Sequence, residues 1–325
     1  SYTYSDMDGR TTIVTKAAEL SYQRGVSTFT AAGNEGNNSW GYIIAPADGF
    51  GTIAVGAVDE FGNVAGFSSH GPTYDGRIKP EVSAQGVSTF GAVAGTSDGY
   101  RSANGTSAAT PIASGVAALL LSAHPHLKNT QIRSIILESA SNSSNPNNQI
   151  GYGIISAKDA IEFPNLEKVG EDYILHKTFL EENIIASSVN IVFQSGDDLL
   201  IAYPMTKSGD YDFTYTFPPR NNGDLIEFTI LYSDSQNNNS TLPQSGKYKF
   251  TYGTDIISLN LEIENPTSNY EVSDFYPNPF NPAAHRTTRI NYYSSGKELF
   301  KLILIDGSGQ KVKEVSTNTF AGENY

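Results

Sequence analysis

The sequence predicts an α/β domain over residues 1–164, followed by two all-β modules over residues 165–265 and 266–325. Three observations support this prediction. Before Pro164, strand-length apolar runs alternate with helical patterns, which is typical of a mostly parallel sheet between two layers of helices. After Pro164, short β-branched and aromatic runs take over. The proline-rich segment Tyr276–Pro282 divides these runs into two groups.

The elements of the α/β part follow from the periodicity of its apolar residues. Thr11–Gly25 has apolar residues at helical spacing, with Gly25 as the stop, and Val26–Ala32 follows as a short strand. Thr52–Val58 is a continuous apolar run, as in a strand buried on both faces. Ser107–Ala123 is apolar almost all round and predicts a central helix. Asn129–Ser139 predicts a third helix, with its isoleucines on one face.

The second half of the chain has short strands separated by turn clusters such as Ser208-Gly209-Asp210. This spacing predicts a β-sandwich in residues 165–265 and a second small β module after the proline-rich segment. The expected strands are Val189–Phe193, Leu199–Tyr203, Tyr211–Phe217, Leu225–Tyr232, Lys247–Tyr252, Arg289–Tyr293 and Phe300–Ile305.

Composition narrows the functional classes. Lys and Arg number 21 against 34 Asp and Glu, and the net charge of −13 opposes a nucleic-acid partner. With no cysteine, the chain has no disulfide, thiolate metal site or cysteine nucleophile. The longest apolar stretch, Ile112–Leu121, is shorter than the ~20 residues of a membrane span, so no transmembrane segment is predicted. Ser1 is not a start methionine and both ends look cut, so we expect a fragment.

Ser107 is the first candidate for chemistry. It lies among small residues in Ala103–Pro111, where a loop enters the apolar helix, with Pro111 expected in the first turns. The first N–H groups of a helix are unpaired, and with the helix dipole they stabilise negative charge near this serine. These residues alone are equally compatible with a serine that only caps the helix.

Asn34 is the second candidate. It follows the strand Val26–Ala32 beside Gly33, and its amide could donate a hydrogen bond to an oxyanion without adding charge. By itself, the segment Gly33–Gly36 is typical of a turn.

Together these two stretches resemble the subtilisin-like serine peptidases, the subtilase family. The family's Gly-Thr-Ser-x-Ala-x-Pro block is present as Gly105–Pro111 and its Ala-Ala-Gly-Asn block as Ala31–Asn34. Further blocks extend the resemblance to about residue 163: Ile53–Val58, Phe67–Pro72, His124-Pro125, Thr130–Arg133 and Gly151–Gly153. The resemblance implies a subtilisin-like α/β domain, truncated here, with Ser107 as nucleophile and Asn34 as oxyanion-hole donor.

The resemblance also implies a pocket for the P1 side chain, the substrate residue before the scissile bond. Ala31, Ala32 and Gly33 would line one wall of this pocket. Ile44 lies about where the family places the pocket floor, and an apolar floor would favour small or medium aliphatic P1 residues. The alternative is that Ile44 is a core residue facing away from the cleft.

A serine nucleophile needs a general base and a carboxylate that orients it. In the family's chain order, Asp and His precede the serine. His70 is the only histidine before Ser107, and it fills a variable position of its block, so we expect both partners upstream of this chain. His124 and His126 are expected to cap carbonyls at the end of the Ser107 helix, whereas His176 and His285 belong to the β modules.

No cofactor and no metal ligand are assigned with certainty. Asp6 and Asp8 look like a turn before the first helix, and calcium enters only as a structural ion that they could bind.

The segment Tyr276–Pro282, with Arg289–Tyr292 and Leu302–Gly309 after it, resembles the C-terminal sorting domain of type IX secretion cargo. The alternative is a proline-rich linker into an immunoglobulin-like domain. The resemblance implies a secreted protein, extracellular or on the cell surface, with the type IX secretion machinery as a partner. Residues 165–265 would then be a spacer sandwich, and both β modules are expected to be immunoglobulin-like.

Two functions compete. The leading one is a secreted serine endopeptidase that acts on protein or peptide substrates through an acyl-enzyme on Ser107, with this fragment alone inactive. The other is a non-catalytic secreted binding or structural protein with a degenerate subtilase domain.

Overall fold

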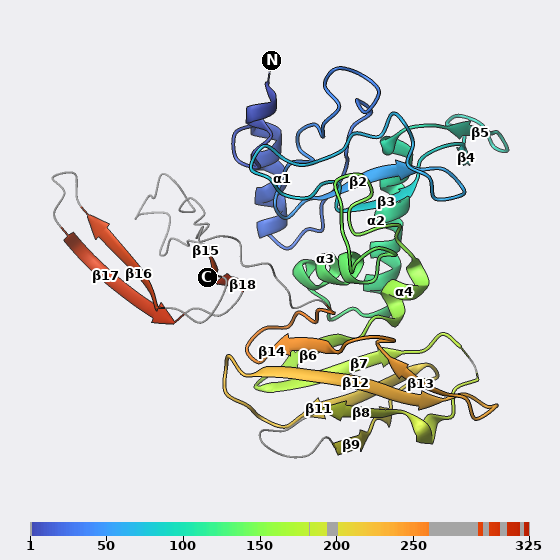
Figure 1. Cartoon of the computed structure of the whole chain (residues 1–325), viewed down its shortest axis with the longest axis vertical. Helices are drawn as coiled ribbons and strands as arrows, with labels where there is room; N and C mark the ends of the chain where they lie inside the picture. Colours follow the sequence, from blue (N-terminus) through green and yellow to red (C-terminus); the bar gives the residue numbers. More distant parts are fainter. Residues whose placement is uncertain are drawn as a thin grey trace. The chain divides into compact units, whose positions relative to one another are not determined.

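The computed structural model describes residues 2–181, 183–193 and 201–259, and the backbone of four strands beyond residue 291 (Figure 1). The chain divides into two compact units. The first comprises Ser1–Pro219, Glu227–Tyr248 and Asp255–Leu259, and the second comprises Arg220–Ile226, Lys249–Thr254 and Asn260–Tyr325. The predicted boundary at residue 164 therefore falls inside the first unit and stays a prediction.

A parallel sheet organises the first part of the chain, as predicted. Its strands are β1 (Phe29–Ala31), β2 (Ile53–Val58) and β3 (Val82–Gln85), in the order β1-β2-β3. All six residues of β2 are buried, which confirms the interpretation of this run as a central strand. The helices are η1 (Tyr4–Asp6), α1 (Ile13–Gln23), α2 (Thr106–Ala123), α3 (Asn129–Glu138) and α4 (Ala157–Glu162).

Helix α2 packs against all three strands of this sheet (Figure 1). Its buried face is formed by small and aliphatic residues at helical spacing: Ala109, Ala113, Val116, Ala117 and Leu120. The prediction of a central helix was only half right, because Ile112, Leu119 and Leu121 on the other face are exposed. Among the described helices, α2 alone is long and apolar enough to cross a membrane, and its contacts with the sheet are those of a core helix.

Pro111 lies inside α2, in its second turn, where a backbone N–H would otherwise be hydrogen-bonded. Proline has no N–H, so the carbonyl of Ser107 lacks its usual partner four residues on. The hydroxyl of Thr110, the residue before Pro111, donates to the carbonyl of Thr106, at 2.8 Å. The first turn of α2 is thus held partly by side chains.

An antiparallel hairpin that the sequence did not predict leads into α2. It consists of β4 (Thr89–Ala92) and β5 (Tyr100–Ala103). The exposed rings of Phe90 and Tyr100 stack across it, with centroids 5.3 Å apart. These residues lack the alternating pattern of a half-buried hairpin, because both strands are exposed.

Antiparallel sheets dominate residues 165–259. One sheet has the order β10-β11-β7-β6 and the other contains β13-β12-β8-β9. The bounds are β6 (Asn165–Val169), β7 (Asp172–Thr178), η2 (Ala186–Ser188), β8 (Asn190–Phe193), β9 (Ile201–Pro204), β10 (Thr206–Lys207), β11 (Asp212–Phe217), β12 (Leu225–Ser233), β13 (Asn239–Leu242) and β14 (Tyr248–Thr251). The sequence missed β6, β7, β10 and β13. The buried rings of Phe193, Phe217 and Phe228 meet edge to face in this core.

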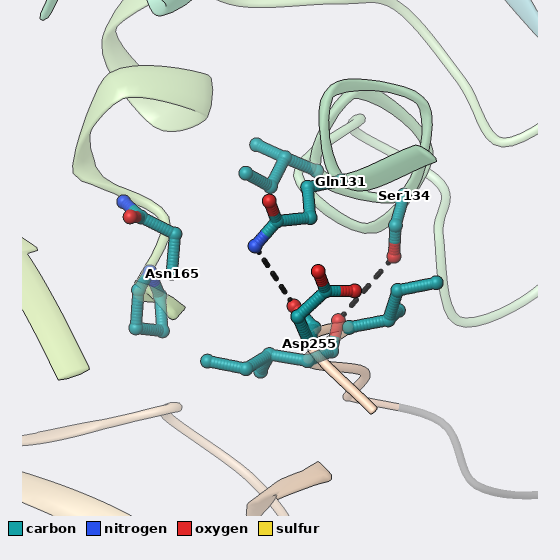
Figure 2. Close-up of a pocket in the computed structure, with 8 residues that line it drawn as sticks. Gln131, Ser134, Asn165 and Asp255 are labelled. Atoms are coloured by element: carbon teal, nitrogen blue, oxygen red, sulfur yellow. Dashed lines mark hydrogen bonds between the residues drawn. The ribbon is translucent and has the colours of Figure 1, made fainter. Parts of the chain in front are cut away.

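Helix α3 is hydrogen-bonded to the part of the chain that follows it (Figure 2). The buried amide of Gln131 donates to the carbonyl oxygens of Leu166, at 2.6 Å, and Asp255, at 3.0 Å. The hydroxyl of Ser134 donates to the carbonyl of Ile257, at 3.4 Å. These bonds join the α/β elements to the β elements within the first unit.

The second unit contains four short strands beyond residue 291. They are β15 (Tyr292–Ser294), β16 (Leu299–Ile305), β17 (Lys311–Asn318) and β18 (Gly322–Asn324). The pairs β15–β18 and β16–β17 are antiparallel. The segment Tyr276–Pro282, on which the secretion prediction depends, lies outside the described residues.

Candidate active site

Ser107 is the second residue of α2, and the chain reaches it through a glycine. Gly105 has φ 141° and ψ 155°, a conformation that residues with a side chain rarely adopt. Its N–H donates to the carbonyl of Gly86, at 2.8 Å, which fixes the loop against the end of β3. Gly105 and Thr106 are buried, whereas Ser107 is exposed, so the hydroxyl is open to a substrate.

The amide of Asn34 is held in one orientation by Thr106. Asn34 Oδ1 accepts hydrogen bonds from Thr106 N, at 2.9 Å, and from Thr106 Oγ1, at 3.0 Å. The buried Thr106 hydroxyl also accepts from Gly33 N, at 3.3 Å. Because the oxygen is occupied, the exposed Asn34 side chain has its NH₂ group free to donate elsewhere. The sequence analysis did not assign this role to Thr106, although it lies within the Gly-Thr-Ser block.

Three polar atoms converge on the space beside Gly105. A Cβ at this residue would lie 2.9 Å from Ser107 Oγ, 3.6 Å from Ser107 N and 3.6 Å from Asn34 Nδ2. Because Gly105 has no side chain, the space beside it is open, and Ser107 Oγ, Ser107 N and Asn34 Nδ2 all lie close to it. An acyl carbon beside Ser107 Oγ would place its oxygen close to both donors, which is the geometry that stabilises an oxyanion.

The four residues expected to form the P1 pocket lie near one another. Ile44 N donates to the carbonyl of Ala32, at 3.0 Å, and a Cβ on Gly33 would lie 3.1 Å from Ile44 Cγ1. Ile44 is 38% exposed, so it is not a core residue. Ala31 is half-buried at the end of β1, and Ala32 is fully buried in the core beside Ile43. Gly33 and Ile44 thus meet directly.

Four histidines lie in the described residues, and each ring contacts a group other than Ser107. His70 Nδ1 lies 2.8 Å from the carbonyl oxygen of Gly71. The sequence predicted that His124 caps the end of α2, but its ring contacts a different helix. His124 Nε2 lies 3.0 Å from the carbonyl oxygen of Ile161, in the last turn of α4. Burial lowers the pKa of His124, so the neutral ring donates to this carbonyl.

The other two histidines contact polar side chains of the β part. His126 Nε2 lies 2.7 Å from Asn165 Oδ1, so this ring does not cap helix carbonyls through Nε2. His176 Nε2 lies 3.0 Å from Glu167 Oε2. A general base for Ser107 is therefore not supplied by any histidine of the described ranges.

Asp6 and Asp8 lie in the turns before α1, as predicted. Asp6 Oδ2 accepts from Thr3 N, at 2.6 Å, and from Thr3 Oγ1, at 2.8 Å. Asp8 accepts from Arg10 N and from both the backbone and the hydroxyl of Thr11, at 2.7–2.8 Å. Each carboxylate is thus used in local turn structure.

The first half of the chain is similar to known proteins. The subtilase family matches residues 1–153. Subtilisin DY of Bacillus licheniformis is 37% identical over 155 residues, which are 46% of this chain and 52% of that protein. Alkaline elastase YaB of Bacillus sp. (strain YaB) is 39% identical over 136 residues, covering 42% of this chain and 33% of the relative.

Solved structures give matches of similar extent. The self-cleaved protease domain of PatA has 33% identity and a TM-score of 0.38, and the match covers 45% of this chain and 52% of that one. Against subtilisin DY, the chain spans about half the length of the relative. Residues 1–153 form a domain of the subtilase family.

Proposed function

We propose that this chain is part of a secreted serine endopeptidase in which Ser107 is the nucleophile. The observation that supports this most directly is the convergence of Ser107 Oγ, Ser107 N and Asn34 Nδ2 on the open side of Gly105. A serine that only capped a helix would not need an amide held beside it by two hydrogen bonds from Thr106.

In the proposed reaction, Ser107 Oγ attacks the carbonyl carbon of the scissile peptide bond while a base takes its proton. Asn34 Nδ2 and Ser107 N donate hydrogen bonds to the oxygen as it becomes negative. The proton then passes to the leaving amine, an acyl-enzyme remains on Ser107, and water releases it. The dipole of α2 adds to the stabilisation because Ser107 lies in the first turn.

The base and its carboxylate are proposed to precede Ser1 in the protein. The four described histidines are engaged elsewhere, and the family's order of Asp, His and Ser puts both partners before the nucleophile. We use the term extended protein for a chain that includes this preceding segment.

Protein or peptide substrates are proposed to place their P1 side chain beside Gly33 and Ile44. The exposed isoleucine offers an apolar surface where a basic side chain would lose hydration without gaining a charge partner. Ala31 and Ala32 would support this wall from the end of β1.

Secretion is also a proposal. One relative is named a halolysin-like extracellular serine protease, from Natrialba magadii, with 36% identity over 137 residues. The segment Tyr276–Pro282 adds the resemblance to type IX sorting domains, with that machinery as partner. The antiparallel sheets of residues 165–259 are compatible with an immunoglobulin-like spacer.

A fluorophosphonate probe, which reacts with activated serines, tests the assignment. The extended protein should be labelled and should hydrolyse peptides, and Ser107→Ala should abolish both. Ser114→Ala is the matched control, because it removes an exposed hydroxyl seven residues further along α2. The 325-residue chain alone should show negligible labelling.

Two outcomes would contradict the proposal. Rapid labelling of Ser107 in the 325-residue chain would show that the base is not in the preceding segment. A folded extended protein that neither labels nor hydrolyses peptides would favour a non-catalytic binding or structural module.

A further inference from the structure

Three metal-ligating side chains meet at the point where α2 ends and the β part begins. His126 lies between α2 and α3, Glu167 is in β6 and His176 is in β7. One ligand atom from each of these residues lies within 4.8 Å of the others. All three belong to the first unit and are half-buried, so a small ion could reach them from solvent.

The pairing of β6 with β7 explains how two of these residues come together. Asn165 is directly opposite His176, and Glu167 is two residues further along β6. Because side chains alternate between the faces of a strand, all three lie on the same face. The opposite face of β7 carries the buried Tyr173 and Leu175. The register of one hairpin therefore places Glu167 and His176 on a common face.

His126 completes the cluster from outside the sheet. Its ring and the ring of His176 have centroids 4.5 Å apart with an angle of 30° between their planes. His176 Nε2 and Glu167 Oε2 are 3.0 Å apart. Ligands of a tetrahedral zinc ion at ~2.1 Å are ~3.4 Å from one another, so small side-chain rotations would bring the cluster to that geometry.

A buried amide orients the His126 ring. Asn165 is 2% exposed, and its Oδ1 lies 2.7 Å from His126 Nε2. Its Nδ2 lies 3.5 Å from the carbonyl oxygen of Phe163, which agrees with the oxygen facing the ring. With a proton on Nε2, the ring would donate to this oxygen and keep a lone pair on Nδ1 for a metal ion. Histidines that bind metals are commonly held by such a contact to their other nitrogen.

We propose that His126, Glu167 and His176 bind Zn²⁺. Two imidazoles and one carboxylate are a donor set that zinc prefers, whereas calcium and magnesium take oxygen ligands. Glu167 offsets one of the two positive charges, and water would take the fourth position. The site connects the segment after α2 to the β6–β7 hairpin, so bound Zn²⁺ would cross-link these two segments.

The experiment uses the 325-residue chain, stripped of metal with a chelator. Titration with Co²⁺ should give the intense visible absorption of a tetrahedral site, Zn²⁺ should displace it at one equivalent, and Zn²⁺ should raise the Tm. Glu167→Gln and His176→Gln should each weaken Zn²⁺ binding at least about 100-fold and remove the Tm rise. Asn165→Ala should weaken binding about 10–100-fold, as for a residue that positions a ligand.

Matched controls are Glu181→Gln and His70→Gln, which change the same residue types outside the cluster and should leave Zn²⁺ binding unchanged. Circular dichroism in chelator checks folding of each variant. A readout on the unaltered chain needs no variant: Zn²⁺ should shift the ring-nitrogen NMR signals of His126 and His176. Absence of Zn²⁺ binding, binding that survives in both ligand variants, or unshifted ring signals would overturn the proposal.

Discussion

The α/β part and the β part of the first unit position polar groups in different ways. Around Ser107, the convergent polar atoms are set mainly by the backbone: a glycine without a side chain, an N–H in the first turn of a helix, and an amide held by Thr106. Around His176, cross-strand register places side chains on one face of a hairpin. The first arrangement suits a transient negative charge, whereas the second suits an ion held by fixed ligands.

This difference leads to separable effects of mutation. Changes at Ser107 and Asn34 should alter turnover with little effect on stability, because these two side chains are exposed. Changes in the β6–β7 region should alter stability with little effect on turnover, because its polar groups are partly buried. The following predictions test this separation, starting with the largest expected effect.

Asn34→Ala in the extended protein should lower kcat about 100–1000-fold, which is the loss measured in subtilisin when its oxyanion-hole asparagine is removed. The hydrogen bond from Nδ2 strengthens only as the oxyanion forms, so KM should change little. Steady-state kinetics and the Tm check this, with the exposed Asn37→Ala as control. An unchanged kcat with a raised KM would contradict the role of Asn34.

Because Lys177 is buried, the free energy of unfolding should increase as pH rises from 8 to 10 and its ammonium loses a proton. Burial lowers the pKa of Lys177 from its ordinary value of 10.5 to about 8, while its ammonium donates to the carbonyl of Glu162 and lies over the Phe179 ring. Between these two pKa values the unfolded chain binds the proton more tightly, so the free energy of unfolding should increase by about 2 kcal/mol.

Urea denaturation at several pH values measures how the free energy of unfolding changes with pH. Lys177→Met should remove the part of this change that Lys177 contributes. Burial also lowers the pKa of Lys79, which pairs with Glu81, so the difference between the two proteins is the informative quantity. Above pH 10 the trend should reverse, because burial raises the pKa of Tyr248. Equal slopes in the original chain and Lys177→Met would rule out the contribution of Lys177.

Thr106→Val in the extended protein should lower kcat about 10-fold. The substitution removes the hydroxyl that donates to Asn34 Oδ1 but keeps the backbone N–H, so the amide loses one of its two restraints. Thr106→Ser retains the hydroxyl and should keep most of the activity. If both variants had the activity of the unaltered protein, Thr106 would not be the residue that orients Asn34.

Ile44→Gly should produce the smallest effect, a change in preference without loss of activity. Removing the side chain beside Gly33 enlarges the proposed pocket, so peptides with Phe or Tyr at P1 should gain relative to those with aliphatic P1 residues. Profiling with P1-varied peptides measures the ratio, and an unchanged profile would remove Ile44 from the site.

Some of these features could be predicted from the sequence because they depend on neighbours along the chain. Helix α1 was predicted from apolar spacing, β2 from an unbroken apolar run, and the Ser107 loop from a compact motif. Each depends on fewer than about twenty consecutive residues, over which local periodicity and turn chemistry dominate.

Other features could not be predicted because they depend on pairing between distant residues. The bond from Thr106 to Asn34 spans 72 positions. The contact between His126 and Asn165 spans 39 positions, and His176 is placed beside Asn165 by the register of β6 with β7, strands that the sequence analysis did not identify. The burial of Lys177 also depends on this pairing, since nothing in its neighbours marks it as a core residue.

The hydrogen bonds of α3 have a consequence for how the first unit unfolds. Gln131 donates to both Leu166 and Asp255, and the Glu138 carboxylate accepts from Ser258 Oγ and Leu259 N. Separating the β segments from α3 would exchange these hydrogen bonds for bonds to water, at a net cost of about 0.5–1.5 kcal/mol for each bond. We therefore expect the β sheets and α3 to unfold together, so that no partly unfolded state exposes the link between them to a protease.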